Sequence, residues 1–165
     1  CEPIWNEIKD QYTVWMADFS DPETVVFIVD DDTELLQGMA DNIRKMKVTV
    51  ETFTSGNKAF EGIKERTMKL AGHKIKLLIC DWMMPDGDGI TLLNKLRENE
   101  IFSSIPFLLM SGAVSKAQLE GALKLDPDGI MLKPFGLQIL PERMRAAIDM
   151  RDKKELEKLM RNSGL

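Results

Sequence analysis

Five short apolar runs, each followed by a stretch with helical spacing, constrain the fold of this chain more than any other feature. The runs are VVFIV at Val25–Val29, VTVETF at Val48–Phe53, IKLLIC at Ile75–Cys80, IPFLLM at Ile105–Met110 and GIML at Gly129–Leu132. Four of them are nearly continuous in apolar residues, which is typical of strands covered on both faces in a parallel sheet. The run at 48–53 alternates more, which indicates a strand nearer the edge of the sheet.

Helical patterns separate these runs, and most begin at a residue suited to cap a helix. The expected starts are Asp32 or Thr33, then Ser55, Asp88, Ser115 and a final helix near Leu137 with Pro141 in its first turn. Five strands alternating with five helices predict an α/β fold, a (βα)₅ doubly wound five-stranded parallel sheet with right-handed connections. We expect the flavodoxin-like strand order 2-1-3-4-5.

Two extensions flank this predicted domain, which we place at residues 22–150. Residues 1–21 form an expected N-terminal amphipathic helical extension, with an apolar stripe made of Ile4, Ile8, Tyr12, Trp15 and Phe19. Packing on its own domain is the interpretation we favour for this stripe; a signalling helix that joins an upstream domain, or a homodimer contact, is the alternative. Residues 151–165 are expected to be a charged C-terminal helical tail. The absence of an initial Met indicates a piece of a longer product, and processing would give the same start.

Composition excludes several classes of function. The 165 residues are 44% hydrophobic and carry a net charge of −5, whereas non-specific nucleic-acid binding needs a basic face. No apolar run approaches the roughly 20 residues that span a bilayer, so no membrane insertion is expected. Of the two cysteines, Cys1 is terminal and Cys80 lies in an apolar run, which predicts a reducing cytoplasm and no disulfide framework.

Polar and charged residues follow four of the five apolar runs directly. Asp30, Asp31 and Asp32 follow the first run, and Asp81 follows the third. Ser111 follows the fourth run and Lys133 the fifth. Ligands of open α/β sheets bind outside the carboxyl ends of the strands, so we expect these side chains to meet at one rim of the sheet.

The chemistry of that rim is restricted by its charges. Carboxylates close together in a partly desolvated site repel one another, and a divalent cation relieves the conflict. Oxygen ligands without His or Cys select a hard ion such as Mg²⁺. Lys133 offers a compact positive charge and Ser111 a hydroxyl, both suited to phosphoryl oxygens. One carboxylate would then be free to accept a phosphoryl group as a nucleophile.

Four motifs in the right order carry a resemblance to a known family. They are VDDD at Val29–Asp32, DWMMPDGDG at Asp81–Gly89, SGA at Ser111–Ala113 and KPF at Lys133–Phe135. On these motifs the chain resembles the receiver domain of bacterial response regulators, the CheY-like superfamily, from about Val25 to Ile148. One such motif alone would carry little weight, but four on the expected elements make a specific signal.

The resemblance implies a role for each matching residue. Asp81 would be the phosphoacceptor, and Ser111 and Lys133 would hold the phosphoryl group. Mg²⁺ would be bound by Asp31, by Asp81 and by the backbone carbonyl of Met83, with Asp30 acting through water. A cis peptide bond between Lys133 and Pro134 is also implied.

The function implied is a phosphorylation-dependent switch of a two-component system or phosphorelay. A histidine kinase or a phosphotransfer protein would donate the phosphoryl group, and a downstream protein or a covalently linked domain would read the changed surface. Such a domain phosphorylates and dephosphorylates itself but turns over no external substrate. It would act alone or as one module of a hybrid kinase or larger regulator.

One departure from the family pattern and two alternative functions remain. The family usually has Tyr or Phe three residues before the lysine, where this chain has Ile130. A haloacid-dehalogenase-like phosphatase would use Asp30 as nucleophile, but Glu34 stands where that superfamily has Thr. The other alternative is a degenerate receiver that serves only as an interaction scaffold.

Overall fold

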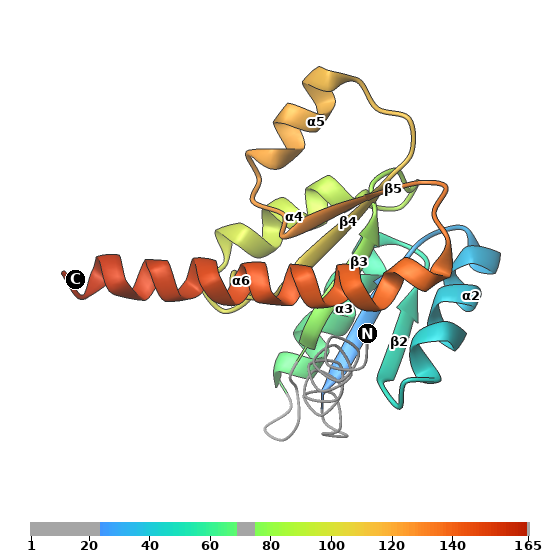
Figure 1. Cartoon of the computed structure of the whole chain (residues 1–165), viewed down its shortest axis with the longest axis horizontal. Helices are drawn as coiled ribbons and strands as arrows, with labels where there is room; N and C mark the ends of the chain where they lie inside the picture. Colours follow the sequence, from blue (N-terminus) through green and yellow to red (C-terminus); the bar gives the residue numbers. More distant parts are fainter. Residues whose placement is uncertain (1–23, 69–74, 165) are drawn as a thin grey trace, which may run out of the picture.

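A parallel sheet with helices on both faces forms the protein (Figure 1). Residues 24–68 and 75–164 are described by the structure, a computed structural model. The strands are β1 (Val25–Val29), β2 (Thr49–Phe53), β3 (Ile75–Asp81), β4 (Phe107–Ser111) and β5 (Gly129–Leu132). They pair in the order β2-β1-β3-β4-β5, so the expected topology is confirmed. The N-terminal helical extension expected at residues 1–21 lies outside the described residues.

Side chains cap the N-termini of most of the described helices. They are α2 (Thr33–Arg44), α3 (Gly56–Met68), α4 (Gly89–Glu98), α5 (Lys116–Leu123) and α6 (Leu140–Asn162), with a 3₁₀ turn, η1, at Leu137–Ile139. Asp32 accepts from the backbone N–H of Leu35, and Asp88 accepts from that of Thr91. Ser115 forms a capping box with Gln118. Each bond satisfies a donor that the first helical turn leaves without an intrahelical partner.

The strand residues alternate between two apolar cores, one on each face of the sheet. Val26, Ile28, Leu77 and Ile79 point to the face covered by α2 and α6. Phe27, Leu78, Cys80 and Leu109 point to the opposite face, together with buried residues of α3 and α4. Burial on both sides explains why the strands read as nearly continuous apolar runs.

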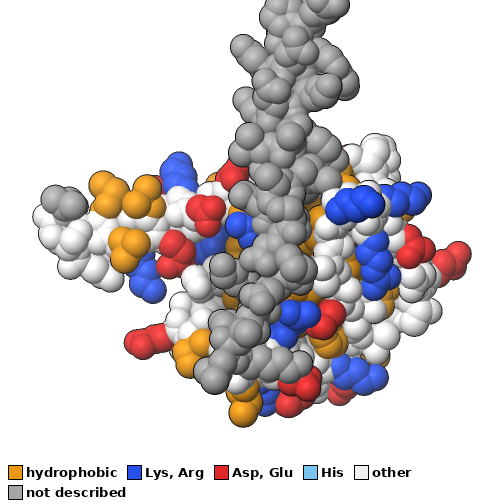
Figure 2. Space-filling view, turned by 90° about the horizontal axis from the view of Figure 1, so that it is seen from below, with side chains coloured by type: hydrophobic (Ala, Val, Ile, Leu, Met, Phe, Trp, Pro, Cys, Tyr) orange, Lys and Arg blue, Asp and Glu red, His pale blue; other side chains and the backbone are white. Residues whose placement is uncertain are grey.

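The last helix continues well past the sheet. α6 extends without a break from Leu140 to Asn162, and its C-terminal end projects beyond the body of the molecule (Figure 1). Arg151 is buried, whereas Leu156, Leu159 and Met160 are exposed. Figure 2 shows apolar side chains among charged ones on this projecting end. Among the described residues, none of the helices combines the length and the hydropathy that crossing a membrane requires.

Candidate functional site

The carboxyl ends of β1, β3, β4 and β5 bring together the polar residues expected at the rim. Asp30 follows β1 directly, Asp81 is the last residue of β3 and Ser111 is the last residue of β4. Lys133 follows β5. Asp30 and Ser111 are fully buried and Asp81 nearly so, which places polar groups at the top of an apolar sheet.

Lys133 joins the two buried carboxylates. Its Nζ donates to Asp30 Oδ2 at 2.8 Å and lies 3.1 Å from Asp81 Oδ1. Asp30 and Lys133 are 103 residues apart in the sequence, and only the parallel topology makes them neighbours. The second oxygen of Asp30 accepts from the backbone N–H of Asp32 at 2.9 Å, so both of its oxygens have a protein partner.

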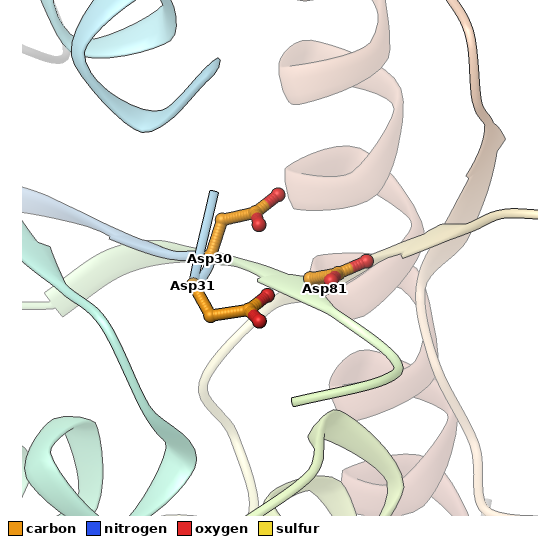
Figure 3. A group of neighbouring side chains, drawn as sticks. All are labelled: Asp30, Asp31 and Asp81. Atoms are coloured by element: carbon orange, nitrogen blue, oxygen red, sulfur yellow. The ribbon is translucent and has the colours of Figure 1, made fainter. Parts of the chain in front are cut away.

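Three carboxylates form a cluster beside this lysine. Asp30, Asp31 and Asp81 each offer one oxygen, and these oxygens lie within 4.8 Å of one another. Figure 3 shows the three side chains coming from the ends of β1 and β3 and lying close together. Asp31 is exposed, so an ion could approach from its side. The all-oxygen donor set fits a hard cation such as Mg²⁺.

The charges of the rim shift the pKa values of its groups. Burial raises the pKa of Asp81, and the neighbouring Asp30 raises it further, although Lys133 acts in the opposite direction. The pKa of Lys133 is raised, because its hydrogen bonds to Asp30 and Asp81 outweigh the burial that opposes its charge. Lys133 therefore stays charged. The ionised form of Asp81 costs the folded protein free energy, because burial and Asp30 both disfavour its negative charge.

Ser111 and the segment after it complete the other side of the rim. The backbone N–H of Lys133 donates to the carbonyl of Ser111 at 2.7 Å, which joins the ends of β4 and β5. The Ser111 hydroxyl donates to the carbonyl of Gly112 at 3.2 Å. Within residues 24–68 and 75–164 this hydroxyl has only that local partner, and rotation about χ1 would turn it to another acceptor. The Lys133–Pro134 peptide bond is cis, as expected.

The loop after β3 returns close to the strand from which it starts. The backbone N–H of Trp82 donates to Met110, and that of Gly89 donates to the carbonyl of Trp82. A Cβ atom at Gly89 would lie 2.2 Å from the carbonyl oxygen of Asp81, so only glycine fits there. Met83 is exposed and Met84 is buried.

The sequence did not indicate which element holds the middle of this loop. Gly56 and Asn57, at the start of α3, contact Asp86 and Gly87. From the sequence, Ser55 is expected only to start a helix, because nothing in the spacing relates residues 55–57 to a loop about 30 residues away.

Together, the doubly wound parallel sheet and the acidic rim with its single lysine define a receiver-type signalling module. The chain belongs to the response regulator receiver domain family, whose model matches residues 26–145. This family acts in two-component signal transduction as a switch and does not turn over an external substrate.

Individual relatives agree with this assignment. Chemotaxis protein CheY1 of Helicobacter pylori is 33% identical over 82 residues, which cover 50% of this chain and 66% of that protein, just under two thirds of its length. Chemotaxis protein CheY of Pseudomonas aeruginosa is 28% identical over 119 residues, or 72% of this chain and 91% of that protein. A CheY-like receiver domain structure from Methanospirillum hungatei has a TM-score of 0.65 at 22% identity, with 79% of this chain and 98% of that chain covered, and it shares the fold.

Proposed function

We propose that Asp81 accepts a phosphoryl group from a histidine kinase or a phosphotransfer protein, and that this modification switches the surface read by a downstream protein or linked domain. The observation that carries the proposal is the position of Lys133, whose Nζ lies within 3.1 Å of both Asp30 and Asp81 beside the three-carboxylate cluster. Positive charge next to a nucleophilic carboxylate is what an incoming phosphoryl group needs.

Asp81 is the carboxylate to which the resemblance to receiver domains assigns the phosphoryl group. Both oxygens of Asp30 accept hydrogen bonds, and Asp81 lies 3.1 Å from the same Lys133 ammonium with 7% of its surface exposed. In the proposed step an Asp81 oxygen forms a bond to phosphorus while the bond from phosphorus to the donor atom breaks and its electron pair leaves with the donor. Lys133 and the Ser111 hydroxyl would then contact two of the phosphoryl oxygens.

The same rim would hold Mg²⁺. Asp31, Asp81 and the backbone carbonyl of Met83 would bind it directly, and Asp30 would act through water. The bound ion would offset the negative charge that the carboxylates and the phosphoryl oxygens bring together.

The test is mass spectrometry of the protein after incubation with acetyl phosphate and Mg²⁺. We expect one added phosphoryl group, its position marked at Asp81 by borohydride reduction of the acyl phosphate, and none in Asp81→Asn. Labelling of Asp30 instead would favour the phosphatase alternative. A wild-type protein that neither binds Mg²⁺ at millimolar concentration nor becomes labelled would overturn the proposal in favour of the scaffold alternative.

A further inference from the structure

The loop that follows Asp81 is held at two separate places. At its ends, Gly89 bonds to Trp82, and Trp82 bonds to Met110 of β4, as described above. In its middle, the backbone N–H of Gly56 donates to the carbonyl of Gly87 at 2.9 Å. The segment 83–85 lies between these two points, and Met83 belongs to it.

The contacts in the middle of the loop are made by consecutive residues of one short segment. The backbone N–H of Asn57 donates to the carbonyl of Asp86 at 3.3 Å, and its side-chain Nδ2 donates to Asp86 Oδ1 at 2.9 Å. Hydrogen bonds from Ser55 and Asn57 lower the pKa of Asp86, so its carboxylate remains charged and able to accept them. We call residues 55–57 the strap.

The backbones of the strap and the loop are in close contact, with no space for a side chain between them. A Cβ atom at Gly56 would lie 2.4 Å from the carbonyl oxygen of Gly87, so any larger residue must displace the loop backbone. Gly87 has a φ of +83°, and a Cβ atom there would lie 2.7 Å from Asn57 Oδ1. Backbone contact this close transmits a change at Gly56 directly to the loop.

We propose that Gly56 and Asn57 are positioning residues that hold the Met83 segment in the geometry needed for Mg²⁺ binding. The inference rests on the proposed function, which assigns a metal-binding role to the backbone at Met83. Neither residue belongs to the acidic rim, and their effect passes through Asp86 and Gly87. The strap thereby connects α3, on one face of the sheet, to the loop that carries Met83.

The experiment is a Mg²⁺ titration of the metal-free protein followed by two-dimensional amide NMR. We expect Asn57→Ala to weaken Mg²⁺ binding about threefold to tenfold, since it removes one hydrogen bond to a charged group and leaves the backbone contacts. Gly56→Ala is expected to weaken it more than tenfold. The unfolding midpoint of each metal-free variant is measured in parallel, because a purely structural role would lower that midpoint and leave the affinity unchanged.

Two control variants and one rescue variant are titrated with Mg²⁺ in the same way. Gly121→Ala makes the same exchange on α5, where a Cβ atom meets nothing within 4 Å. Asn94→Ala removes a similar amide–carboxylate bond, to Glu98, within α4. The double variant Asn57→Asp with Asp86→Asn reverses the bond at constant net charge, and we expect it to restore the affinity to within about twofold.

A second readout separates positioning from catalysis. In Asn57→Ala, the Mg²⁺ concentration that gives half-maximal labelling by acetyl phosphate should rise in step with the dissociation constant, while the rate at saturating Mg²⁺ stays within about twofold of wild type. Unchanged affinity in Asn57→Ala and in the folded Gly56→Ala protein would overturn the strap proposal and leave the proposed function intact. Absence of Mg²⁺ binding in the wild type would overturn both.

Discussion

At the scale of single residues, the rim places two buried carboxylates against one ammonium group. Asp30 and Asp81 both contact Lys133, and the third acid, Asp31, lies at the exposed side of the cluster. Without a metal ion the cluster carries more negative than positive charge in a partly desolvated place. Sites of this kind cost stability, which proteins tolerate where the groups serve a function.

Asp81→Asn is therefore expected to stabilise the metal-free protein at pH 7, by on the order of 1 kcal/mol in the free energy of unfolding. The folded state raises the pKa of Asp81, so ionised Asp81 is disfavoured relative to the unfolded chain at any pH above that raised pKa. As the pH falls through the raised pKa, wild-type Asp81 takes up a proton and the advantage of the variant should shrink.

Urea unfolding between pH 7 and pH 4 checks this, with Asp152→Asn as the control. Asp152 is an exposed carboxylate on α6, so its change removes the same charge far from the rim. A variant no more stable than wild type at pH 7, or a gain that grows toward pH 4, would contradict the expectation. Added Mg²⁺ should stabilise the wild type more than Asp81→Asn.

Lys133→Met is expected to strengthen Mg²⁺ binding at the rim and to slow the phosphorylation of Asp81. Removal of the ammonium group leaves Asp30 and Asp81 without their shared cation, so the cluster should bind Mg²⁺ several-fold more tightly. The phosphoryl group would lose a positive partner, so labelling by acetyl phosphate should slow at least tenfold. Parallel measurement of Mg²⁺ affinity and labelling rate tests both parts; equal loss of both would indicate a misfolded rim instead.

At the scale of elements, the helix caps and the residues that follow each strand are predictable from the sequence, because they depend on neighbours a few positions away. The caps at Asp88 and Ser115 are confirmed, and of the two candidates Asp32 and Thr33 the structure selects Asp32. Such caps are predictable because each side chain bonds to a backbone group within three residues. The rim was also predictable, since parallel strands deliver the residues after them to one edge, and this brought Lys133 to Asp30.

Contacts without such a rule could not be predicted. Arg97, Asp128 and Arg151 come from three separate segments and carry no local signal, yet they meet at the amino ends of β4 and β5. Ile105 was expected to begin the fourth strand, but β4 begins at Phe107, after Pro106, which has no N–H group to donate. The contact between the strap and the loop after β3 could not be predicted either, because it depends on how segments far apart in the sequence pack together.

The cluster around Asp128 joins α6 to the sheet. Asp128 is buried and accepts from the backbone N–H of Phe107, from Arg97 and from Arg151. Burial opposes the charge of Arg151, but its hydrogen bonds to Asp128 and Asp126 raise its pKa above the ordinary value. Lys154 adds bonds to the same two carboxylates. Arg151 and Lys154 thus anchor the segment expected to be a charged tail.

Arg151→Met is expected to lower the free energy of unfolding by about 2–4 kcal/mol, because it leaves a buried carboxylate with fewer partners. Lys153→Met is the matched control, an exposed neighbour on the same helix that should change stability by less than about 0.5 kcal/mol. Urea unfolding of both variants makes the comparison, and equal stability of the two would refute the anchoring role.

A chain that ends at residue 150 should lose at least as much stability as Arg151→Met. That result would argue against a domain boundary at residue 150.

At the scale of the whole molecule, α5 packs only loosely on the other described elements. Only Ala122 of its eight residues is buried, and Figure 1 shows the helix standing away from the sheet. An apolar groove of about 540 Å³ lies beside it, with Ile130 among its lining residues. Ile130 is smaller than the aromatic side chain usual in the family, so this position offers no aromatic ring that could rotate on phosphorylation.

Phosphorylation should therefore reach α5 through the backbone between Ser111 and its N-cap, Ser115. If the Ser111 hydroxyl bonds to the phosphoryl group, residues 112–115 are drawn toward the rim and α5 moves over the groove. We expect amide hydrogen exchange of residues 112–123 to slow severalfold with beryllofluoride and Mg²⁺, while residues 148–162 of α6 exchange as before. Ser111→Ala should bind Mg²⁺ with an affinity close to wild type and lose most of this protection. Equal protection in Ser111→Ala would show that the change reaches α5 by another path, through β5 and Lys133.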